Sequence, residues 1–128
     1  YALVEAFPPG SLSLILPARK AQDARLGGNA IAVRCVVHPV ALALVDAVGP
    51  ITATSANPSG EDPALDTQVC AERLGLPSEA AAPGTCPGGS GSTFLLLEPN
   101  EEVVEVSVIR AGVVPPTDVM AWVTSRRA

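Results

Sequence analysis

Short apolar runs alternate with polar stretches rich in glycine and proline along the chain, a pattern typical of an α/β (α+β) fold. Runs of apolar and β-branched residues that are bounded by turn residues predict buried strands. Such runs fall at residues 12–16, 31–37, 51–54, 93–97 and 103–109. Strands alternate with helices in the first half and pair with each other in the second. The sequence therefore predicts a twisted mixed β-sheet flanked by helices.

Two internal helices are predicted from their end signals. Pro39 stands at the first position of a helix over 40–48, which is apolar nearly all round and is therefore expected to be buried on most sides. Asp66 is the expected N-cap of a second helix that ends before Gly75.

The remaining segments are predicted as loops and one terminal helix. Residues 18–29 form a polar loop with one helical turn, and residues 77–91 form a long loop rich in Pro, Gly, Ala and Ser. Thr117 is the expected cap of a peripheral helix within 113–128.

Composition restricts the class of protein. A chain of 128 residues that is 48% hydrophobic suits one domain over 1–128, with a core of Ala, Val, Leu and Ile because aromatic residues make up only 3%. No apolar stretch approaches the roughly 20 residues that cross a bilayer. The net charge of −5, with Lys20 the only lysine, argues against a general nucleic-acid coat.

Three cysteines without Cys-x-x-Cys spacing, and a single histidine, indicate reduced thiols in a cytoplasmic protein. Neither a disulfide framework nor a metal site is expected. Because the chain begins with Tyr1 instead of Met, we expect it to be either a trimmed chain or one part of a longer protein.

Polar groups gather where predicted strands end, and ligands of open α/β sheets often lie beyond the carboxyl ends of strands. Arg34 and Arg110 each end an apolar run, where a guanidinium could bind a carboxylate or phosphate. The alternative for each is a solvated surface arginine, such as one in an ion pair.

Two loops complete this set of candidates. Thr54, Ser55 and Asn57 close the third predicted strand, where they could line a ligand or simply cap a turn. Residues 87–93, Pro-Gly-Gly-Ser-Gly-Ser-Thr, could point several backbone amides at an anion, although Gly-Ser loops are also common linkers. This loop has neither the Walker nor the Rossmann glycine spacing. No covalent nucleophile is indicated: Cys35 is expected to be a buried strand residue.

Five blocks in a fixed order resemble the YrdC/Sua5 family, the threonylcarbamoyl-AMP synthases. The most specific is Thr-Ser-Ala-Asn-Pro-Ser-Gly at 54–60, which is similar to the Ser-x-Asn signature of that family. The resemblance covers about residues 6–112 and implies a YrdC/RibB-like fold. The blocks read PPGSLSLILPA, IAVRCVVHPVALAL, ITATSANPSG, GGSGSTFLLL and VIRAG.

The resemblance implies an enzyme that joins ATP, L-threonine and bicarbonate into threonylcarbamoyl-adenylate with release of pyrophosphate, usually with Mg²⁺. The product serves modification of adenosine 37 in tRNA, so a tRNA threonylcarbamoyl transferase is the expected downstream partner. By position, Arg34 and the backbone at Ala53 would contact threonine. The ATP-binding positions would be Ser55, Asn57, Pro63, Ser92 and Arg110.

Alternatives remain open at this point. The family carries an upstream Lys-x-Arg motif that this chain does not contain, so the resemblance implies a partial domain, the carboxyl-terminal portion. The chain could instead be a carbamoyl-adenylating domain, an RNA-binding module or an inactive truncated homologue.

Overall fold

The structure, a computed structural model, describes residues 2–127 and divides the chain into two compact units. Unit 1 comprises Tyr1–Val37 and Ser90–Ala128, and unit 2 comprises His38–Gly89. Tyr1 and Ala128, the two ends of the predicted domain, lie outside the described residues. The single domain over 1–128 therefore stays a prediction.

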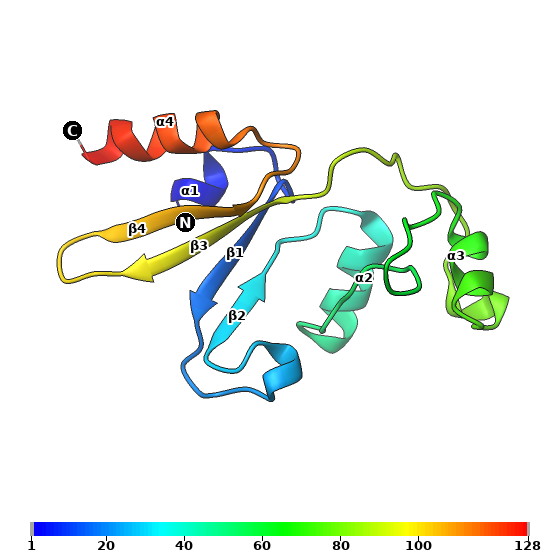
Figure 1. Cartoon of the computed structure of the whole chain (residues 1–128). Helices are drawn as coiled ribbons and strands as arrows, with labels where there is room; N and C mark the ends of the chain where they lie inside the picture. Colours follow the sequence, from blue (N-terminus) through cyan, green and yellow to red (C-terminus); the bar gives the residue numbers. More distant parts are fainter. Residues whose placement is uncertain (1, 128) are drawn as a thin grey trace. The chain divides into compact units, whose positions relative to one another are not determined.

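Unit 1 is built on a four-stranded sheet in the order β2-β1-β3-β4 (Figure 1). The central pair, β1 and β3, is parallel, whereas β2 and β4 run antiparallel to their neighbours, so the sheet is mixed as predicted. The strands are β1 (Leu12–Pro17), β2 (Ala30–Val33), β3 (Thr93–Pro99) and β4 (Val104–Arg110).

Strand β2 is shorter than predicted. The sequence predicts a strand over 31–37, but pairing with β1 ends where Val33 lies opposite Leu14, and residues 34–37 leave the ladder. A strand persists only while a neighbour supplies its backbone hydrogen bonds. The predicted helical turn between β1 and β2 is confirmed as a short 3₁₀ helix, η1 (Ala24–Leu26).

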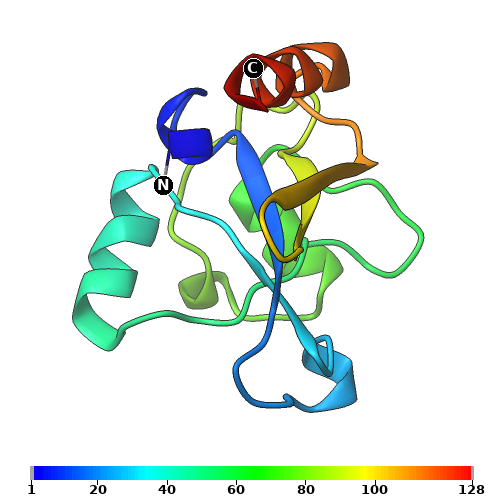
Figure 2. The ribbon, with the colours of Figure 1, turned by 90° about the vertical axis from the view of Figure 1, so that its left-hand side faces the viewer.

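Two helices, α1 (Ala2–Glu5) and α4 (Pro116–Arg127), cover one face of this sheet, where Figure 2 shows them together. Leu95 of β3 and Val119 of α4 are both fully buried in the cluster between the layers. The predicted terminal helix is thus present as α4, and it supplies part of the core of unit 1. Thr117 lies inside the first turn of α4 and bonds the Asp118 side chain, so it is not the cap.

Unit 2 carries α2 (Pro39–Val48), α3 (Thr67–Arg73) and a 3₁₀ helix, η2 (Ser78–Ala80). The predicted cap of α3 is confirmed: the Asp66 carboxylate accepts hydrogen bonds from the backbone N–H groups of Gln68 and Val69. Gly75 follows the helix at φ +66°, as expected of a glycine after a helix end.

Two predictions for unit 2 are wrong. Residues 51–54 form no strand, because within the described part of unit 2 no neighbouring strand offers them a hydrogen-bonding edge. Helix α2 exists, but none of its residues is buried; Val40 is 52% exposed and Val48 is 63% exposed. An apolar sequence favours burial, yet burial also requires a surface to pack against.

Within residues 2–127, no helix has the length and the apolar character that spanning a bilayer would require.

Candidate functional site

Polar residues from all four strands lie at one end of the sheet in unit 1, which we call the sheet edge. Because β2 and β4 run opposite to β1 and β3, the carboxyl ends of the outer strands meet the amino ends of the central strands at this edge (Figure 1). Arg34 follows β2, Ser92 precedes β3 and Arg110 ends β4. The structure thus brings together three of the predicted site residues. The prediction that all candidate groups lie at carboxyl ends is wrong for Ser92, which stands at an amino end.

A buried hydrogen bond between two serines joins the central strands at this edge. Ser13 Oγ of β1 lies 2.7 Å from Ser92 Oγ, and the two residues are only 3% and 4% exposed. A hydrogen-bonded pair of neutral hydroxyls can be buried at little cost, whereas either hydroxyl without a partner would be costly. The hydrogen bond to Ser13 of the neighbouring strand therefore holds the Ser92 side chain in place.

Arg34 is anchored to the glycine before β1. Its Nε donates to the Gly10 carbonyl oxygen at 2.8 Å, which leaves the outer nitrogens of the exposed guanidinium available for a carboxylate. The alternative of a surface ion pair does not apply within residues 2–127, where Asp23 with Arg25 is the one pair that the structure shows.

Arg110 is positioned by two contacts. Its Nη2 donates to the Ser92 carbonyl oxygen at 3.2 Å, and its guanidinium carbon lies 4.1 Å from the centre of the Phe94 ring. A cation over an aromatic face is attracted by the ring quadrupole, and the stacking restricts the side chain. Arg110 is thereby directed along the same edge as Ser92.

A third serine at this edge has an unsatisfied hydroxyl. Ser11 is 7% exposed, and its Oγ has no hydrogen-bond partner among the described residues. Such an atom is uncommon in a folded protein and calls for a water or a ligand atom. Ser11 and Ser13 carry no prediction from the sequence, although their alternation with Leu12 on a strand predicted as buried was a usable signal.

Thr93 and Gly112 hold the end of β4 against the start of β3. The Thr93 hydroxyl donates to the Val114 carbonyl at 2.7 Å and accepts from the Val114 N–H at 3.1 Å. Gly112 approaches so closely that a Cβ atom there would stand against the Gly91 carbonyl oxygen and 2.5 Å from that of Ser92.

We expect Gly112→Ala to destabilise unit 1 by about 1–3 kcal/mol, the usual range for overpacking, because backbone rather than a flexible side chain blocks the methyl group. Urea unfolding followed by fluorescence of Trp122, the only tryptophan in the chain, measures this loss. Gly60→Ala is the matched control for the added methyl group, since nothing lies within 4 Å of its Cβ position, although its positive φ adds strain of its own. Unchanged stability in Gly112→Ala would contradict the close approach.

The other four predicted site residues lie in one loop of unit 2. Ala53, Ser55 and Pro63 are exposed and Asn57 is half-buried. The Asn57 amide nitrogen donates to the carbonyls of Pro58 and Glu61, at 3.0 and 2.8 Å, so this side chain closes its own turn. Its Oδ1 is buried with no partner among the described residues.

The turn interpretation of this loop is thus supported by Asn57, while the exposed Ser55 hydroxyl stays available to a ligand. Convergence of this loop with the sheet edge of unit 1 stays a prediction.

Asp23 and Arg25, in the loop between β1 and β2, have shifted pKa values. The Arg25 guanidinium, which donates to both carboxylate oxygens, holds the pKa of Asp23 below its ordinary value. The same contact raises the pKa of Arg25. Both side chains are largely in solvent, so the pair is a surface feature with no part in the sheet edge.

Among residues 2–127, no group of three or more His, Cys, Asp and Glu side chains could hold a metal ion. The sheet edge itself offers hydroxyls and guanidinium groups, which suit an anion.

Comparison with known proteins gives one family. The family model Sua5/YciO/YrdC, described as telomere recombination, matches residues 1–112. A putative threonylcarbamoyl-AMP synthase of Mycobacterium tuberculosis is 34% identical over 125 residues, covering 86% of this chain and 58% of that protein. A threonylcarbamoyl-AMP synthase of Halorhodospira halophila is 36% identical over 88 residues, covering 66% of this chain and 46% of that protein.

The chain thus spans about half the length of the curated relatives it matches. No solved structure matches the chain significantly.

Proposed function

The chain belongs to the Sua5/YciO/YrdC family, and from this premise we propose that it carries the nucleotide- and threonine-binding part of a threonylcarbamoyl-AMP synthase. Its substrates are ATP, L-threonine and bicarbonate, and its product serves the modification of adenosine 37 in tRNA through a downstream threonylcarbamoyl transferase. The protein acts in the cytoplasm. The observation that carries the proposal is the sheet edge, where hydrogen bonds fix Arg34, Ser92 and Arg110 at the ends of their strands and Ser11 has a buried hydroxyl without a partner.

The two arginines have different roles. Arg34 binds the threonine carboxylate through the outer nitrogens that its bond to Gly10 leaves available. Arg110 binds phosphate oxygens of ATP, because its stacking on Phe94 fixes a cation beside the Ser92 backbone. Both tasks suit a planar fork of N–H donors better than a lysine.

The loop of unit 2 carries the other residues of this proposal. Ser55 and Asn57 line the nucleotide, with Pro63 at the border, and the backbone at Ala53 borders the amino acid. Small side chains without charge let an adenylate lie close to the backbone, and the unsatisfied Asn57 Oδ1 is a free acceptor for it.

The chemistry requires positioning more than a nucleophilic side chain. The threonine amine combines with bicarbonate to give a carbamate and water. A carbamate oxygen then attacks the α-phosphorus of ATP, the bond to the bridging oxygen breaks, and pyrophosphate leaves with its electron pair. Charge that develops on the phosphate oxygens is stabilised by preorganised cations and N–H groups.

Mg²⁺ fits this chain only as an ion carried by the substrate. The described residues at the sheet edge include no carboxylate, and Mg²⁺ is usually bound through one or two carboxylates together with substrate phosphates.

ATP binding to the full chain tests the proposal. Isothermal titration calorimetry is expected to show binding that Arg110→Ala weakens about 10- to 150-fold, since a hydrogen bond to a charged group contributes about 1.5–3 kcal/mol. The control Arg73→Ala removes an exposed arginine of unit 2 and should leave binding unchanged. Absence of ATP binding would overturn the proposal.

Pyrophosphate release separates the remaining alternatives. Release that depends on threonine identifies the synthase, and release that depends on carbamoyl phosphate identifies a carbamoyl-adenylating domain. ATP binding without release identifies an inactive homologue. Retention of RNA at physiological salt without nucleotide binding would favour an RNA-binding module, for which a net charge of −5 is unfavourable.

A further inference from the structure

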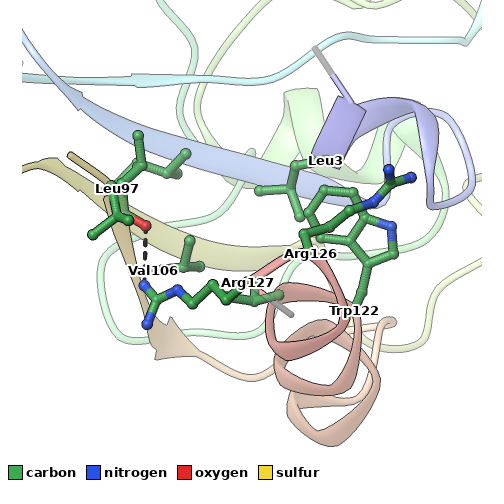
Figure 3. A pocket seen from close by; sticks show the side chains of 9 residues that line it. Leu3, Leu97, Val106, Trp122, Arg126 and Arg127 are labelled. Atoms are coloured by element: carbon green, nitrogen blue, oxygen red, sulfur yellow. Dashed lines mark hydrogen bonds between the residues drawn. The ribbon is translucent and has the colours of Figure 1, made fainter.

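A hollow of about 290 Å³ lies in unit 1 between α1, α4 and the hairpin of β3 and β4 (Figure 3). It is far from the sheet edge that holds Arg110, because Val104 and Arg110 stand at opposite ends of β4, about 20 Å apart in an extended strand. A ligand here would therefore not compete with the proposed nucleotide.

The walls of this hollow are apolar. Leu3 and Val123, which are 8% and 6% exposed, also belong to the hydrophobic cluster of unit 1. Leu97, Val106 and Trp122 line the hollow from the hairpin and from α4. Apolar walls without a covering side chain favour an apolar occupant, since transfer of such a group out of water is favourable.

Two adjacent arginines line the same hollow. The Arg126 guanidinium lies 5.2 Å from the centre of the Trp122 ring, and Arg127 donates through Nη2 to the Val104 carbonyl at 3.1 Å (Figure 3). Each guanidinium has five N–H donors, so both have donors left over. Within residues 2–127 neither forms an ion pair, although the chain has 13 acidic residues.

Arginines in the last turn of a helix also interact favourably with its carboxyl end. That effect requires only proximity to the helix end. It does not explain why Arg126 lies over the Trp122 ring or why Arg127 bonds the neighbouring hairpin, both beside the same apolar hollow.

We propose that this hollow binds a short aliphatic carboxylate. Its hydrocarbon tail lies against Trp122, Val106 and Leu97, and its carboxylate lies at the Arg126 guanidinium. The volume is close to about 300 Å³, the lower end of the range for small-molecule pockets, which suits a tail of roughly six to eight carbons.

Titration of the full chain with octanoate tests the proposal, with Trp122 as an intrinsic fluorescent probe and calorimetry as a second readout. Each buried methylene contributes about fourfold to affinity, so octanoate, with two more methylenes, is expected to bind about 15-fold more tightly than hexanoate. Octan-1-ol tests the tail without the charge and acetate tests the charge without the tail; both are expected to bind at least about 10-fold more weakly than octanoate.

Arg126→Gln is expected to weaken octanoate binding about 10-fold, and far-UV circular dichroism checks that this exposed substitution leaves the fold intact. Calorimetry is the deciding readout here, because the substitution also changes the surroundings of Trp122. Arg19→Gln is the matched control: Arg19 lines a separate hollow beside Leu16 and Ile31 and should have no effect.

Three results would overturn the proposal. They are equal affinity for octanoate and octan-1-ol, loss of binding in Arg19→Gln with binding kept in Arg126→Gln, and absence of saturable octanoate binding. None of them bears on ATP binding at the sheet edge, so the two proposals can fail independently.

Discussion

Thr93→Val is expected to lower the free energy of unfolding of unit 1 by about 2–6 kcal/mol, although the two side chains have nearly the same shape. The Thr93 hydroxyl is the partner of both the Val114 N–H and the Val114 carbonyl, and neither residue is more than 5% exposed. Valine leaves both backbone groups buried without a partner, at about 1–3 kcal/mol each. The loss is large beside the 5–15 kcal/mol that typically stabilises a domain.

Urea unfolding followed by Trp122 fluorescence measures the effect of Thr93→Val, because Trp122 reports on α4 of the same unit. Thr93→Ser is the matched control. It keeps the hydroxyl and loses only a methyl group, so we expect a loss of about 1 kcal/mol. Equal losses in the two variants would show that packing, and not the two hydrogen bonds, gives Thr93 its importance.

Arg34→Ala is expected to weaken L-threonine binding at least about 100-fold under the proposed function. Two charge-assisted hydrogen bonds to the carboxylate would be lost together, and each contributes about 1.5–3 kcal/mol. The bond that holds the Gly10 carbonyl would be lost as well, so the start of β1 would be less well fixed. Calorimetry with threonine, in the presence of a non-hydrolysable ATP analogue, measures the change.

Arg34→Lys and Arg19→Ala are the controls for Arg34→Ala. A lysine keeps the charge but cannot form the planar fork, so we expect an intermediate loss of about 10-fold. Arg19 is an exposed arginine of the same unit, and its removal should leave threonine binding unchanged. Threonine affinity that survives Arg34→Ala would remove this residue from the site.

The candidate site could be predicted in part from the sequence. The place of Arg34 and Arg110 at strand ends could be predicted because each arginine ends an apolar run, and the family resemblance pointed to Ser92; their roles in binding stay predictions. Ser11 was not found. Its alternation with Leu12 and Ser13 was a usable signal of burial, but only the absence of a partner for its buried hydroxyl marks it as a candidate.

The sequence by itself determined the features that depend on neighbours along the chain. The cap of α3 by Asp66, the start of α2 at Pro39 and the hairpin of β3 and β4 follow from local backbone preferences and hydrogen bonds within a few residues. Family membership also follows from the sequence, because five ordered blocks preserve local signals over most of the chain.

Only the tertiary structure decided which segments have partners. The apolar residues 51–54 and α2 satisfy local preferences for strand and helix, yet the first lacks a neighbouring edge in unit 2 and the second has no buried residue. The last helix is part of the core because Val119 meets Leu95. Strand pairing and burial depend on contacts between residues far apart in the chain, so no local pattern specifies them. The same long-range contacts set the strand directions that bring Arg34 and Arg110 to one end of the sheet.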